Sequence, residues 1–187
     1  MRKVIITLLV LLFTFSSGFA MTVAGVTIPA ISQVGNEKLV LNGVGIRKAT
    51  WFKVKVYVGA LYVAERSNNA DSILKSGSAK FLTMQFVRDV SAQKLRNGWS
   101  EAFGNALRDD GPLKKQLQPK IEQFNSHMPD IKDGERIELT FHSDRVEFVI
   151  TKQKPVVIKG KHFSRALLSV WFINALDEGL RDGLLGK

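Results

Sequence analysis

The sequence predicts an α+β domain, in which an antiparallel sheet carries a layer of helices on one face. Strand-like segments come first, two helical patterns follow, three more strands come next, and helical patterns close the chain. Two connections between the later strands, Ser143-Asp144 and Gln153-Lys154, have the length of hairpin turns. The sequence contains neither βαβ repetition nor a phosphate-binding glycine loop, which argues against a parallel α/β sheet.

The first twenty residues have the composition of a secretory signal peptide. Two basic residues precede an almost entirely apolar run over residues 4–15, and small residues lead up to Ala20. The apolar run is shorter than the roughly 20 residues that a membrane-spanning helix needs. We therefore predict a signal peptide over residues 1–20, export to a periplasm, and one domain over residues 21–187.

Composition narrows the classes of function. The chain has no cysteine, which excludes disulfides, zinc thiolates and thiol nucleophiles. A formal net charge of +10 favours anionic partners, such as carboxylates or the head groups at a membrane surface. The basic residues are spread along the chain without interleaved aromatic residues, so we expect no nucleic-acid partner.

The first half of the chain is read mainly as strands. The clearest strand covers residues 53–64, where alternation puts Val54, Val56 and Val58 on one face and Lys53, Lys55 and Tyr57 on the other. Asn42-Gly43 is a turn signal between two shorter strands. The remaining elements expected here are strands over residues 23–28, 38–41, 45–49 and 80–87 and a short helix over residues 70–75.

The second half begins with a helix capped by Ser91. Its apolar residues fall at helical spacing on one face: Ala92, Leu95, Trp99, Ala102, Phe103 and Ala106. A second helix is expected over residues 113–124, with a kink or break at Pro119. The later elements expected are strands over residues 135–141, 146–151 and 155–158 and helices over residues 164–176 and 177–185.

Two groups of motifs resemble the chalcone isomerase superfamily. They are Gly43-Val-Gly-Ile-Arg47 with Lys55-Val-Tyr57 and Leu61-Tyr62-Val63, and Ala166-Leu-Leu-Ser-Val-Trp-Phe with Leu184-Leu-Gly186 near the end. The resemblance covers most of the chain after the predicted signal peptide. It implies an open-faced β-sandwich, a long antiparallel sheet whose helical layer holds a ligand cleft.

The same resemblance separates two branches of that superfamily. Arg47 stands where both the true isomerases and the fatty-acid-binding members carry an arginine, and Tyr57 stands where the fatty-acid-binding branch has a tyrosine and the isomerases a threonine. Leu95, Ala102 and Val170 fall where the isomerases carry polar side chains. The resemblance therefore implies a position nearer the fatty-acid-binding branch and leaves enzyme activity open.

Arg47 and Tyr57 are the candidate ligand-binding residues. A guanidinium donates two parallel hydrogen bonds to a carboxylate, and a tyrosine hydroxyl can add a third. A small amphipathic carboxylate, resembling a fatty acid, is thus the expected partner. From the residues alone, Arg47 could instead pair with an internal carboxylate or reach solvent, and Tyr57 could be a core aromatic residue.

Two other functions stay open: an isomerase or lyase acting on a phenolic or enone substrate, with Arg47 stabilising an oxyanion, and a structural or interaction module without a ligand. No catalytic residue is assigned. His127, His142 and His162 are scattered without metal-ligand spacing, and no nucleotide motif occurs. We therefore expect neither a metal nor a cofactor.

Overall fold

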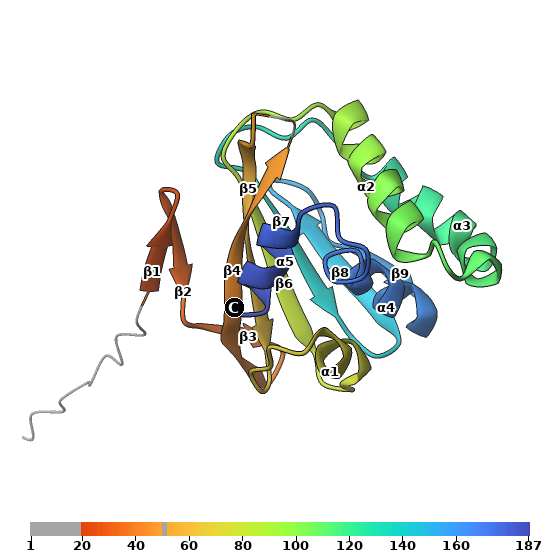
Figure 1. Cartoon of the computed structure of the whole chain (residues 1–187), viewed down its shortest axis with the longest axis horizontal. Helices are drawn as coiled ribbons and strands as arrows, with labels where there is room; N and C mark the ends of the chain where they lie inside the picture. Colours follow the sequence, from red (N-terminus) through yellow and green to blue (C-terminus); the bar gives the residue numbers. More distant parts are fainter. Residues whose placement is uncertain (1–19, 50–51) are drawn as a thin grey trace, which may run out of the picture.

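The computed structural model of the chain describes residues 20–49 and 52–187. The predicted signal peptide lies, apart from Ala20, outside the described residues. An antiparallel sheet of seven strands, in the order β3-β4-β5-β6-β7-β8-β9, carries helices on one face (Figure 1), which confirms the α+β prediction. The strands are β3 (Ile31–Val34), β4 (Glu37–Ala49), β5 (Val54–Val63), β6 (Lys80–Phe86), β7 (Arg136–Phe141), β8 (Arg145–Ile150) and β9 (Val156–Lys159). The helices are α1 (Ala70–Lys75), α2 (Ala92–Ala106), α3 (Gly111–Ser126), α4 (Lys161–Ser169) and α5 (Glu178–Leu184).

A separate two-stranded hairpin precedes this sheet. It consists of β1 (Ala20–Val23) and β2 (Val26–Pro29), so the single strand expected over residues 23–28 is wrong. Ala24 and Gly25 between the strands have φ angles of 49° and 82°. Two consecutive positive φ angles are what a tight two-residue hairpin turn requires. The chain therefore reverses inside the segment that alternation alone reads as continuous.

Strand β4 runs unbroken for 13 residues, so the turn expected at Asn42-Gly43 is also wrong. Leu41 pairs with Tyr62 and Gly43 with Leu61, which leaves Asn42 as the extra residue of a β-bulge. The Asn42 side chain accepts a hydrogen bond from the Ser67 amide at 2.8 Å and donates to the Leu184 carbonyl at 2.7 Å. The Asn42 side chain thus joins the bulge to the backbone of Ser67 and Leu184 by hydrogen bonds.

The helices agree with the predictions unequally: α1 has the expected bounds, whereas α3 and α4 differ from them. Ser91 caps α2 by accepting a hydrogen bond from the Lys94 amide, as expected. Helix α3 continues through Pro119, so of the kink or break expected there, the break is wrong. Proline removes the hydrogen bond to the carbonyl four residues earlier. That residue, Lys115, is exposed, and water can serve its carbonyl group. Helix α4 ends at Ser169, well before the predicted end at residue 176.

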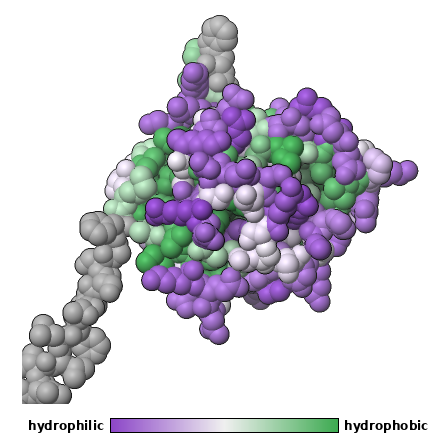
Figure 2. Space-filling view, turned by 60° about the horizontal axis from the view of Figure 1, so that its bottom comes forward, coloured by the Kyte–Doolittle hydropathy of each residue, from purple (hydrophilic) through white to green (hydrophobic). Residues whose placement is uncertain are grey.

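Apolar side chains pack on both faces of the main sheet. The larger cluster lies between the sheet and the helices, and its fully buried members include Leu61, Leu82 and Phe124. A smaller cluster lies under the β1–β2 hairpin and holds Ile28, Val58 and Tyr62. Figure 2 shows hydrophobic patches between hydrophilic side chains on one face of the molecule. None of the described helices is long and apolar enough to cross a membrane.

Candidate functional site

A cavity of about 340 Å³ lies between the sheet and the helical layer. Strands β4, β5 and β6, helix α2 and the segment from Val170 to Leu180 contribute its lining. Most of the lining side chains are apolar, among them Met84, Phe86, Leu95, Trp99, Ala102 and Val170. The interior of the domain is thus not completely filled, and the space is lined mostly by groups suited to a hydrocarbon chain.

Arg47 and Tyr57 line this cavity from neighbouring strands. They are direct cross-strand partners of β4 and β5, and the next pair is Lys48 with Lys55, which leaves Val56 as an extra residue in β5. Val56 and Tyr57 therefore both face the cavity, and the strict alternation expected along residues 53–64 is wrong at this point. A bulge that re-aims side chains beside a cavity is a common feature of binding sites.

Arg47 does not stand alone in the cavity. Its Nη1 lies 3.4 Å from Oδ2 of Asp177 and also donates to the backbone carbonyl of Lys48. The side chains of Arg47 and Asp177 are 22% and 13% exposed, respectively. Arg47 therefore pairs with an internal carboxylate, which is one of the alternatives that the sequence left open. Such a pair is expected because a cation shielded from water is strongly disfavoured without a partner.

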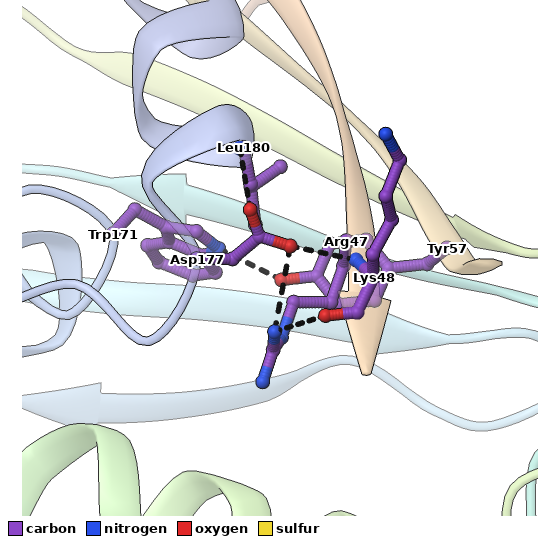
Figure 3. A network of polar contacts seen from close by, with 6 residues as sticks. All are labelled: Arg47, Lys48, Tyr57, Trp171, Asp177 and Leu180. Atoms are coloured by element: carbon purple, nitrogen blue, oxygen red, sulfur yellow. Dashed lines mark hydrogen bonds and ion pairs between the residues drawn. The ribbon is translucent and has the colours of Figure 1, made fainter. Parts of the chain in front are cut away.

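Asp177 is held in place by two backbone amides. Its Oδ2 accepts a hydrogen bond from the Lys48 amide at 2.7 Å, and its Oδ1 accepts one from the Leu180 amide at 3.0 Å, which makes it the N-cap of α5. Figure 3 shows these groups beside the hydrogen-bonded pair of Tyr57 and Trp171. The carboxylate thus links the end of β4 to the start of α5.

Tyr57 is buried, and its hydroxyl accepts a hydrogen bond from Trp171 Nε1 at 3.1 Å. Burial raises the pKa of Tyr57 to about 12. The Trp171 hydrogen bond and the Arg47 charge lower this pKa by smaller amounts, and the Asp177 charge raises it slightly. The hydroxyl accordingly stays protonated near neutral pH. Since it accepts from Trp171, its own proton can be donated to a ligand.

Two glycines of β4 explain how α5 comes so close to the strand. A Cβ on Gly45 would lie 2.5 Å from the Leu180 carbonyl oxygen, and one on Gly43 would collide with the backbone of Gly183 and Leu184. Only glycine at these positions lets the helix pack directly on the strand. This close approach places the N-cap residue Asp177 beside Arg47.

Other predicted residues fall at or near this site. Leu95, Ala102 and Val170, chosen by the resemblance as apolar counterparts of isomerase side chains, all line the cavity. Sequence reasoning missed Asp177 and named Trp171 only within the closing motif of the resemblance. The N-cap pattern before α5 could have drawn attention to Asp177, but nothing in the sequence pairs it with Arg47.

The lining also includes charged groups away from Arg47. Arg88, shortly after the end of β6, and Lys94, in the first turn of α2, are both exposed. Asp89 forms an ion pair of 2.9 Å with Lys132, which lies outside the lining. Within residues 20–49 and 52–187, no group of three or more His, Asp or Glu residues is arranged to hold a metal ion.

The described residues thus form an α+β domain in which an antiparallel sheet and a helical layer border a mostly apolar cavity that Arg47 and Tyr57 line. A family model described as chalcone isomerase-like matches residues 20–186, and the chain belongs to this family. This confirms the resemblance based on the motifs around Arg47 and Tyr57.

Solved structures show the same fold. A crystal structure of a fatty-acid binding protein from Arabidopsis thaliana matches with a TM-score of 0.70 and 20% sequence identity. The match covers 90% of this chain and 97% of the plant chain. A search of curated protein sequences finds no match.

Proposed function

We propose that the domain binds a small amphipathic acid, such as a fatty acid, in the cavity between sheet and helices. The main support for this proposal is that Arg47 and Tyr57 lie side by side on β4 and β5 in a cavity with mostly apolar walls. An acid head group meets the guanidinium and the hydroxyl, and its hydrocarbon tail extends along the apolar walls. The fold shared with a plant fatty-acid binding protein supports this proposal.

The two parts of the ligand have different roles in binding. Each buried methylene group contributes about 0.8 kcal/mol, so the tail supplies most of the affinity. The hydrogen bonds to Arg47 and Tyr57 mainly orient the ligand. The cavity of about 340 Å³ lies near the lower end of the range of about 300–1,000 Å³ typical of small-molecule sites, which favours a short or medium chain.

The cavity lining favours binding over isomerase or lyase chemistry. Such chemistry requires a group that moves a proton, and Tyr57 with its pKa of about 12 is a weak acid there. The carboxylate of Asp177 also lines the cavity, but it is engaged by Arg47 and by two backbone amides. Leu95, Ala102 and Val170 offer no proton donor or acceptor. The cavity itself argues against the alternative of a structural module without a ligand.

We also propose that the protein is exported to a periplasm and loses residues 1–20. The support is the composition of the N-terminal segment. Native mass spectrometry of the protein from a periplasmic extract tests export and binding together. The expected mass is that of the chain starting at Met21 plus one bound lipid acid.

The variant Arg47→Ala is expected to lose the bound lipid, whereas Arg66→Ala, which changes an exposed arginine outside the cavity lining, is expected to keep it. Retention of the same lipid by Arg47→Ala would refute the assignment of the head-group site. Turnover of a chalcone by the unchanged protein, at a rate well above background, would refute the preference for binding over catalysis.

A further inference from the structure

The Arg47–Asp177 pair gives the polar end of the cavity no net charge of its own. Arg47 Nη1 and Asp177 Oδ2 lie 3.4 Å apart, and both residues line the cavity. Asp177 cannot swing away freely, since doing so would break its hydrogen bonds to the amides of Lys48 and Leu180. A ligand entering the cavity therefore meets a fixed negative charge beside the arginine.

The fixed charge affects different head groups unequally. A carboxylate is attracted by Arg47 and repelled by Asp177 from a neighbouring position, and both interactions are strengthened by the low exposure of the pair. An alcohol feels no such repulsion and can still accept the proton of the Tyr57 hydroxyl, which itself accepts from Trp171. Figure 3 shows the Asp177 carboxylate and the Tyr57 hydroxyl on the same side of the Arg47 guanidinium.

We propose that Asp177 is a specificity-determining residue that lowers the preference of the site for carboxylates and admits uncharged oxygen-bearing head groups. The inference rests on the proposed ligand site at Arg47 and Tyr57. It extends the ligand class from fatty acids to long-chain alcohols and related neutral amphiphiles. Selectivity then comes from a residue that the ligand need not touch, because the charge of Asp177 acts on the head group through space.

The test compares two ligands of equal chain length, decanoate and decan-1-ol, by isothermal titration calorimetry at pH 7. The measured quantity is the ratio of the Kd of the alcohol to the Kd of the acid. In Asp177→Asn, which removes the charge and keeps an N-capping side chain, we expect this ratio to rise about tenfold, equivalent to about 1.4 kcal/mol. A ratio is insensitive to a loss of active protein that affects both ligands equally.

Two further variants complete the design. Glu178→Gln removes a charge at the next position, where the side chain is 80% exposed, and should leave the ratio unchanged. Asp177→Ser keeps a capping hydroxyl without the charge and should reproduce the rise seen with asparagine. If the two Asp177 variants raise the ratio by less than threefold, or lower it, Asp177 only positions Arg47 and the proposal is wrong.

The outcomes separate the two proposals. If the unchanged protein binds neither ligand, the proposed function itself fails, and with it the basis for a role of Asp177. If the unchanged protein binds decanoate and the ratio does not respond to Asp177, the proposed function stands and only the inference about selectivity is overturned.

Discussion

The alkaline titration of Tyr57 offers a direct measure of how well the cavity is shielded from water. Burial raises the pKa of Tyr57 in the folded protein from 10.0 to about 12. Between these two pH values, the unfolded chain releases the tyrosine proton and the folded protein retains it. The unfolded state then binds fewer protons, so the free energy of unfolding falls as the pH rises through this interval.

The shift sets the size of the effect. A shift of this size corresponds to about 3 kcal/mol of stability, present below pH 10 and lost as the pH approaches 12. In Tyr57→Phe this loss should disappear. The variant should also be less stable at neutral pH by about 1–3 kcal/mol, because Trp171 Nε1 loses the hydroxyl that accepts its hydrogen bond.

Urea unfolding at pH 8 and at pH 11, where about half of this stability is lost, measures both effects when Tyr57→Phe is compared with the unchanged protein. The chain has only two tyrosines, so the variant Tyr62→Phe leaves Tyr57 as the only group whose tyrosinate absorbance can be titrated. Tyr62 has to be replaced for this titration, because burial raises its pKa to about 12 as well and the two tyrosines would titrate together. An ordinary pKa near 10 for Tyr57 in folded Tyr62→Phe would show a water-exposed hydroxyl and refute the buried site.

Two further substitutions test packing around the cavity. Gly45→Ala should lower the free energy of unfolding by about 1–3 kcal/mol, because its Cβ would lie 2.5 Å from the Leu180 carbonyl oxygen. Gly98→Ala, where a Cβ meets nothing within 4 Å in helix α2, should raise stability slightly in the same urea assay, and equal effects of both changes would contradict the close helix–strand approach. Ala102→Leu should weaken decanoate binding more than tenfold in calorimetry, since the added carbons displace about two methylenes at about 0.8 kcal/mol each. Ala106→Leu, one turn further along α2 and outside the lining, should bind normally, and an unchanged affinity of the Ala102 variant would place the ligand elsewhere.

The predictions from sequence succeed where the signal is local. Ser91 begins α2 as its capping side chain indicates, and the later strands are joined by the hairpins that their short connections require. The predictions fail at the two bulges, where the sequence indicates a turn in β4 and regular alternation in β5 instead of one extra residue in a strand. The extra residues are Asn42 and Val56, and neither residue type distinguishes a bulge from a turn or a regular strand.

The polar centre of the site could be predicted only in part. Arg47 and Tyr57 lie close together in sequence and on paired strands, and the family resemblance singles out both. Their other partners are remote: Asp177 lies 130 residues from Arg47, and Trp171 lies 114 residues from Tyr57. No periodicity in a single sequence encodes such a contact, which depends on how α5 and the segment before it return to the sheet.

The motif around Arg47 joins fold and site through one close contact. Gly43 and Gly45 belong to the motif that carries the family resemblance, and in the structure their role is to lack a side chain beneath α5. With the helix held against β4, its N-cap Asp177 meets Arg47, two residues beyond Gly45. A larger residue at Gly45 would move the carboxylate away from the guanidinium as well as strain the core. The backbone of β4 therefore controls the charge that a ligand meets, although neither glycine has a side chain to touch it.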